Sequence, residues 1–137
     1  MMNRRVTMAA SLVIVALAGA WSIECAVAQA PAGFKRVELQ RHDLVTPDHE
    51  AVLARGEFAP GAAVPRHSHP GDEVAYILEG EITLEIDGKP PLKLKGGDSF
   101  FVPAGQVHQA KNTGTVAAAI LSTYVIEKGK PLATPAK

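Results

Sequence analysis

Residues 66–73 read Arg-His-Ser-His-Pro-Gly-Asp-Glu (RHSHPGDE), which places two imidazoles one residue apart and a carboxylate four residues after the second. If the chain is extended here, His67 and His69 point to the same side of a sheet, because side chains alternate along a strand. Pro70-Gly71-Asp72 predicts a turn that brings Glu73 to the head of the next strand. Two imidazoles and a carboxylate can occupy one face of a metal's coordination sphere. On spacing alone, a metal site and a polar loop with solvated histidines are equally open interpretations.

The strand predicted after Glu73 adds a reason to favour a cation. Ala75 and Ile77 share the parity of Glu73, so the carboxylate is predicted to face an apolar interior. Burying an unpaired carboxylate is costly, and a cation beside it removes that cost. His108, on the strand predicted after the turn at residues 103–105, is the fourth candidate ligand.

Outward from this stretch, short apolar and β-branched runs alternate with Gly and Pro, and no window keeps a helical apolar period for three turns. The pattern predicts an all-β domain. Residues 81–89, EITLEIDGK, alternate up to an Asp-Gly turn, and residues 92–95, LKLK, alternate again. These strands are predicted to pair, with the two lysines facing water opposite Thr83 and Glu85.

Further strands are predicted at residues 99–102, 107–111 and 116–126. Their spacing is typical of a sandwich or barrel. The 116–126 run is apolar at both parities, which predicts that both faces are covered, one by the core and the other by a second sheet or subunit. Residues 34–49 mostly fit a loop. The tail from residue 128 is predicted to fray or to lie across a neighbour.

Two longer strings resemble a known family. Residues 61–80, GAAVPRHSHPGDEVAYILEG, and residues 97–112, GDSFFVPAGQVHQAKN, resemble the two sequence motifs of the cupin superfamily without a mismatch. The first motif is matched at Gly61, His67, His69, Glu73 and Gly80, and the second at Gly97, Pro103, Gly105, His108 and Asn112.

The resemblance implies a small, single-domain jelly-roll β-barrel, also called a double-stranded β-helix. In such a barrel, His67, His69, Glu73 and His108 would converge on one divalent transition metal. Iron, manganese, nickel, cobalt and zinc all accept imidazole together with a carboxylate, so the ligands do not choose among them. The glycines of both motifs are expected in turns. Asn112 is interpreted as a structural hydrogen-bonding residue and not as a ligand.

Three histidines and one glutamate leave coordination positions free on an octahedral ion, for Lewis-acid polarisation of a bound oxygen or for activation of dioxygen. One hypothesis is therefore a metal-dependent, dioxygenase-like oxidoreductase acting on a small chelating substrate of enolic or flavonol type. Glu73 would then be a catalytic residue, serving as ligand and as proton acceptor. The alternatives are a decarboxylase, isomerase or lyase with the same ligands, and a non-catalytic cupin that binds a metal or a small molecule.

The first 28 residues are predicted to be a secretory signal peptide. Two arginines precede an apolar run at residues 9–20, and Ala26-Val27-Ala28 supplies the small residues of a cleavage site. The run is shorter than the ~20 apolar residues of a transmembrane helix. We therefore expect a cupin domain at residues 29–137, exported to a periplasm or to the extracellular space. It would contain no cysteine, because Cys25 is removed.

Charge narrows the range of partners. The chain carries 14 basic and 14 acidic residues without a basic cluster, which argues against nucleic acid or, after signal cleavage, a membrane as partner. The expected partners are a small-molecule substrate or ligand and a second copy of the chain in a homodimer. By parity, Tyr76 is predicted to face away from the ligands, toward packing or a subunit interface.

Overall fold

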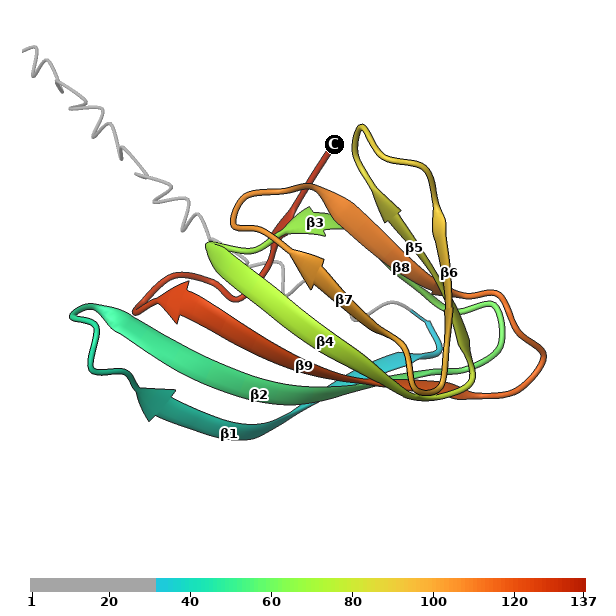
Figure 1. Cartoon of the computed structure of the whole chain (residues 1–137), viewed down its shortest axis with the longest axis horizontal. Coiled ribbons are helices and arrows are strands. Elements are labelled where there is room, and N and C mark those ends of the chain that lie inside the picture. Colours follow the sequence, from blue (N-terminus) through green and yellow to red (C-terminus); the bar gives the residue numbers. More distant parts are fainter. Residues whose placement is uncertain (1–31) are drawn as a thin grey trace, which may run out of the picture.

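Two five-stranded antiparallel sheets face each other in the computed structural model, which describes residues 32–137 (Figure 1). The first sheet contains, in spatial order, β1 (Phe34–Asp43), β2 (His49–Phe58), β9 (Ala118–Glu127), β4 (Gly71–Glu79) and β7 (Ser99–Val102). The second contains β10 (Thr134–Pro135), β3 (Ala63–Ser68), β8 (His108–Asn112), β5 (Glu81–Ile86) and β6 (Leu92–Lys95). The all-β jelly-roll prediction is confirmed. The proposed signal peptide, residues 1–28, lies outside the described residues.

The core lies between the inner faces of the two sheets. Alternate residues of β4 and β5 are buried, and Ile77, Ile82 and Leu84 are fully shielded from solvent. Burying a side chain of this size stabilises the fold by about 1.5 to 3 kcal/mol. Within residues 32–137 no helix is long and apolar enough to span a membrane.

The hairpin of β5 and β6 forms as predicted, with one correction to its pairing. Thr83 lies opposite Lys93, but Lys95 lies opposite Glu81 and not Glu85. Antiparallel strands run in opposite directions, so the residue two positions after Lys93 faces the residue two positions before Thr83. Glu85 pairs instead with Gln109 of β8.

The expectation of a loop over residues 34–49 is wrong for most of its length. Residues 34–43 form β1, which pairs with β2 through a register that shifts between Glu38 and Gln40. β1 is an edge strand and most of its residues are exposed, so it has little of the apolar alternation that marks a half-buried strand.

The prediction that both faces of the last strand are covered holds only in part. On β9 the inward residues Ile120, Tyr124 and Ile126 are buried, whereas Val125 on the other face is 38% exposed. The outer face of this sheet is thus only partly covered within the chain.

The C-terminal tail folds back onto its own chain instead of fraying. β10 pairs with β3, with Thr134 opposite Ser68 and Pro135 opposite His67. Leu132 packs against the small core cluster that contains Tyr124. The tail therefore covers the free edge of β3, and a proline is tolerated there because an edge strand needs few backbone donors.

Candidate metal centre

Two strands of one sheet and one strand of the other bring the four predicted ligands together. His67 lies on β3 and His108 lies directly opposite it on β8. His69 follows the end of β3, and Glu73 projects inward from β4 of the facing sheet. All four side chains are buried, with exposed fractions of 2 to 8%. The polar loop with solvated histidines is therefore excluded as an interpretation.

The turn between His69 and Glu73 is held in place by neighbours. A Cβ atom on Gly71 would lie 1.9 Å from the carbonyl oxygen of Val125, so only glycine fits where β4 begins beside β9. The Asp72 carboxylate accepts a hydrogen bond of 2.9 Å from the amide of Ala104, and the amide of Gly105 donates to the carbonyl of His69 at 2.9 Å. These bonds join the turn after His69 to the turn that leads into His108.

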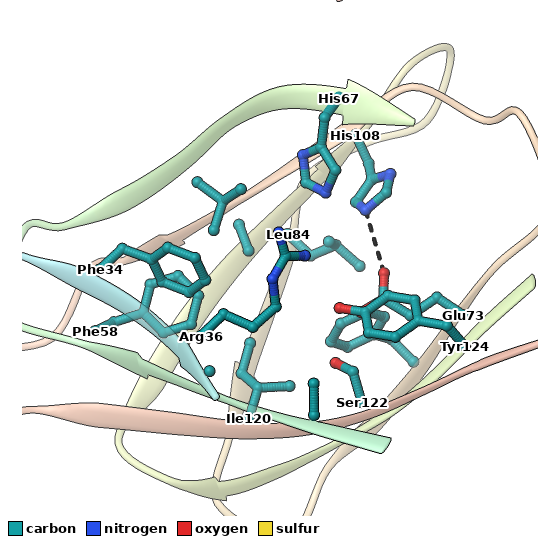
Figure 2. A pocket seen from close by; sticks show the side chains of 15 residues that line it. Phe34, Arg36, Phe58, His67, Glu73, Leu84, His108, Ile120, Ser122 and Tyr124 are labelled. Carbon is teal, nitrogen blue, oxygen red and sulfur yellow. Dashed lines mark ion pairs between the residues drawn. The ribbon is translucent and has the colours of Figure 1, made fainter. Parts of the chain in front are cut away.

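The ligand atoms of the three histidines lie within 4.8 Å of one another. The Nε2 atoms of His67 and His69 are 3.2 Å apart. One carboxylate oxygen of Glu73, Oε2, lies 3.3 Å from the Nε2 atoms of both His69 and His108. Figure 2 shows the contact between His108 and Glu73 as a dashed line at the edge of a cavity. The three histidines are thus positioned for a metal site, with Glu73 beside two of them.

Backbone carbonyls fix which nitrogen of each imidazole carries the hydrogen. The Nδ1 atoms of the three histidines lie 2.6 to 3.0 Å from the carbonyl oxygens of Pro65, Leu132 and Gln106. A carbonyl can only accept, so each neutral imidazole donates from Nδ1 and leaves a lone pair on Nε2.

Lone pairs that face one another repel unless something positive lies between them. Here three Nε2 lone pairs and a carboxylate oxygen converge in one small volume. A proton can bridge only two of these atoms, whereas one divalent cation can accept all four. Nitrogen and carboxylate donors in this number fit a divalent transition metal, and outer hydrogen bonds that fix the imidazoles are typical of metal sites.

The ionisation states of His67 and Glu73 also favour a metal site. Burial lowers the pKa of His67 to about 4, so this imidazole is neutral at neutral pH. Burial alone would raise the pKa of Glu73, but hydrogen bonds that His108 and His69 donate when Nε2 carries a proton outweigh burial and hold that pKa below its ordinary value. A neutral imidazole and a charged carboxylate are the forms that bind metal ions.

A small cavity adjoins the histidines on the inner side of the barrel (Figure 2). Its volume is about 40 Å³, room for no more than a few water molecules. His67, His108, Glu73 and Tyr124 are among its polar lining residues, and Leu84 is among its apolar ones. Burial raises the pKa of Tyr124 to about 12, so its hydroxyl stays protonated.

The structure also agrees with the predictions for Asn112 and Tyr76. Asn112 is fully buried and donates from Nδ2 to the carbonyl oxygens of Phe58 and Val116, which agrees with a structural role. Tyr76 is 48% exposed on the outer face of β4, away from the ligands, as parity predicts.

Sequence reasoning missed the C-terminal partner of the site and one wall of the cavity. The carbonyl of Leu132 that orients His69 carries no signal in the sequence, because every residue has a carbonyl. Arg36 and Tyr124 line the cavity from β1 and β9. The parity of Tyr124 could have placed it on the inner face, but nothing in the sequence linked β1 to the site.

The fold and the buried histidines define a small β-barrel protein whose interior holds three histidines positioned for a metal ion. A family model described as a cupin domain matches residues 54–124, more than half of the 137-residue chain. The chain belongs to the cupin family.

Part of the chain is similar in sequence to curated proteins. Germin-like protein subfamily 2 member 2 of Arabidopsis thaliana is 42% identical over 77 residues, which cover 53% of this chain and 35% of that protein. The chain spans about a third of the length of this relative and of Nectarin-1 of Nicotiana langsdorffii x Nicotiana sanderae.

Two solved structures share the fold. Oxalate oxidase in complex with the substrate analogue glycolate gives a TM-score of 0.61 at 24% identity, over 74% of this chain and 54% of that chain. The DMSP lyase DddQ from Ruegeria pomeroyi gives a TM-score of 0.61 at 25% identity, over 74% of this chain and 51% of that chain.

Proposed function

We propose that this protein is a mononuclear metal-binding cupin that takes a small oxygen-donor substrate in the cavity beside its metal. In this proposal His67, His69, His108 and Glu73 hold one divalent transition metal. The observation that carries the proposal is the convergence of three Nε2 lone pairs and one carboxylate oxygen within a buried site. Iron, manganese, nickel, cobalt and zinc all suit this donor set.

The proposed activity is that of a metal-dependent, dioxygenase-like oxidoreductase. When bound, the metal would supply Lewis-acid polarisation or dioxygen activation. Glu73 would serve as ligand and as acceptor of a substrate proton, because its carboxylate stays charged at neutral pH. The Tyr124 hydroxyl, protonated at neutral pH, would donate a hydrogen bond into the cavity.

The volume of the cavity limits the size of the substrate. Pockets for drug-sized ligands usually enclose roughly 300 to 1,000 Å³, whereas this one has a volume of about 40 Å³. A flavonol would not fit within this volume. The volume favours the smallest members of the chelating class, with few non-hydrogen atoms.

A lyase, decarboxylase or isomerase with the same ligands is the second candidate, and the likeness to a DMSP lyase favours including it in the test. A non-catalytic cupin that holds a metal or small molecule is the third. These candidates share the metal site and differ only in the fate of the ligand.

Metal analysis tests the shared premise. The purified protein is loaded separately with each of the five metals, dialysed and analysed for metal content. We expect about one equivalent of at least one metal, and a large loss of binding in His108→Ala because a ligand is removed. His42→Ala is the matched control, since His42 is exposed on β1. Less than about a tenth of an equivalent of every metal would contradict the proposal.

Turnover of small substrates then separates the candidates. Oxygen uptake and product analysis are followed with small enediols, 2-hydroxy acids and a flavonol for comparison. Oxygen consumption that depends on metal and on Glu73 supports the oxidoreductase. Metal-dependent cleavage without oxygen consumption supports a lyase or decarboxylase, and tight binding without turnover supports the non-catalytic alternative.

Export and dimerisation complete the proposal. Residues 1–28 have the pattern of a signal peptide, so N-terminal sequencing of the exported protein should begin at Gln29.

For the homodimer, Val74, Tyr76 and Phe101 form an outer apolar face that a second copy of the chain would cover. Tyr76→Glu is expected to shift light scattering from dimer to monomer without loss of metal, and a monomeric wild type would contradict the dimer.

A further inference from the structure

One cationic side chain reaches the cavity from the edge strand β1. Phe34 and Arg36 lie on the same face of β1, and both line the cavity. The ring of Phe34 packs against Phe58, with 4.7 Å between the ring centroids. Figure 2 shows the Arg36 side chain extending between these rings and the pair formed by His108 and Glu73. Because Arg36 also remains exposed, it lies where the cavity opens to solvent.

Arg36 differs from the other arginines of the described chain. Arg41, Arg55 and Arg66 each form an ion pair with a carboxylate. Among residues 32–137, Arg36 makes no such pair. A guanidinium carries five donors in a fixed fork that matches a carboxylate, so this one keeps its pairing capacity for a ligand.

The surroundings of Arg36 favour an anion over a neutral group. Within residues 32–137, Arg36 is the only lysine or arginine that lines the cavity. Arg36 and Tyr124 line the same cavity. Apolar walls weaken the screening of charge by water, which strengthens a charge-assisted hydrogen bond. A divalent metal would more than offset the charge of Glu73, so the loaded cavity would be net positive.

We propose that Arg36 recognises the carboxylate of a small carboxylate substrate, whose other end approaches the metal site. The guanidinium would bind both carboxylate oxygens at the mouth of the cavity, and the Tyr124 hydroxyl would donate to the same anion. The subsite rests on the proposed function, because the metal orients the far end of the substrate. The small cavity volume limits that substrate to a few non-hydrogen atoms beyond the carboxylate.

Calorimetric titration with acetate as the probe tests this assignment. Acetamide has the same shape without the charge, and inorganic phosphate tests a different anion. Each probe is titrated into metal-loaded and metal-free protein. Arg36→Gln removes the proposed partner, and Arg55→Gln is the matched control because it removes the same charge from β2, where Arg55 pairs with Glu57 and Glu79.

The expected result is a loss of acetate affinity of about tenfold or more in Arg36→Gln. Arg55→Gln should bind acetate as the wild type does. Acetamide binding should not change with either substitution. Metal content is measured in every variant and should remain at the wild-type value. In metal-free protein the effect of Arg36→Gln on acetate binding should persist, although all affinities are weaker.

Three outcomes would overturn the assignment or separate it from the metal proposal. Unchanged acetate binding in Arg36→Gln with normal metal content would contradict the role of Arg36 and leave the proposed function intact. Phosphate binding tighter than acetate and dependent on Arg36 would contradict a carboxylate. Absence of metal in the wild type would contradict the proposed function, while the titration of metal-free protein would still test Arg36. If Arg36→Gln does not fold, Arg36→Lys replaces it, and a loss of acetate affinity is again expected because lysine lacks the fork.

Discussion

Each face of β4 departs from the usual distribution of polar and apolar residues. On the inner face, Glu73 is 5% exposed and lies in line with Ala75 and Ile77. On the outer face, Val74 is 55% exposed and Tyr76 48% exposed. Buried charge and exposed large apolar side chains both cost free energy unless a partner compensates. The inner face therefore points to a cation and the outer face to a second protein surface.

The two faces should differ most in their contribution to stability. Ile77→Ala removes a fully buried side chain from the inner face, and should lower the free energy of unfolding by about 2 to 5 kcal/mol. Val74→Ala, three residues earlier on the outer face, should cost less than about 0.5 kcal/mol. Urea unfolding of both variants at low protein concentration measures the difference. Equal losses would show that the outer face is already covered within one chain.

The charge on the inner face should matter most for metal binding. Glu73→Gln keeps the shape of the side chain but removes its charge, and should weaken metal affinity at least about 100-fold. Glu79→Gln is the control, because Glu79 is exposed on the same strand. Titration against a chelator of known affinity measures both. An unchanged affinity in Glu73→Gln would remove Glu73 from the ligand set.

Acid should destabilise the metal-free protein through the inner face. The pKa of His67 falls from 6.5 in the unfolded chain to about 4 in the fold, chiefly because the imidazole is buried. Between these values the unfolded chain binds more protons than the folded one, so stability is full above pH 6.5 and falls as the pH drops toward 4. The lowered pKa of Glu73 acts in the same direction at lower pH.

Urea midpoints measured from pH 7 to pH 4 follow this loss. His67→Asn should flatten the profile in the upper part of that range, whereas His42→Asn should leave it unchanged because His42 is exposed. A wild-type midpoint that is constant over the range would contradict a buried, neutral His67.

The smallest expected effect concerns the tail. Ending the chain after Lys130 removes the Leu132 carbonyl that lies 2.6 Å from Nδ1 of His69, and should weaken metal affinity about tenfold. Ending it after Ala136 keeps this contact, the pairing of β10 with β3 and the hydrogen bond from the Ala136 amide to the Arg66 carbonyl, so affinity should stay near the wild type. Equal losses in both truncations would mean that the tail does not orient His69.

The inner face of β4 could be predicted from the sequence, because alternation fixes which residues share a side. The same rule placed the strands that carry Ile82 and His108, and the two motifs implied that His67, His69, Glu73 and His108 meet. β5 and β8, which carry Ile82 and His108, lie within a residue or two of the predicted bounds, whereas the pattern did not predict β2.

The alternation of polar and apolar residues does not predict exposed strands, strand register or the fold of the tail. β1 is an exposed edge strand, so its residues show little of the apolar alternation that marks a strand, and no pattern predicts the position of Arg36. Only one of the two predicted pairs between β5 and β6 forms, because an antiparallel hairpin reverses the order of partners and Lys95 therefore faces Glu81. The fold of the tail depends on backbone hydrogen bonds at the edge of β3, and these leave no mark on residue identity.

The central claim is that one metal binds at the four inner ligands. Crystals of metal-loaded protein, measured at the absorption edge of that metal, test it most directly. We predict one anomalous peak per chain at about 2.0 to 2.2 Å from the Nε2 atoms of His67, His69 and His108 and from a carboxylate oxygen of Glu73. A saturated crystal without a peak at this position, or with a peak bound by other residues, would contradict the claim.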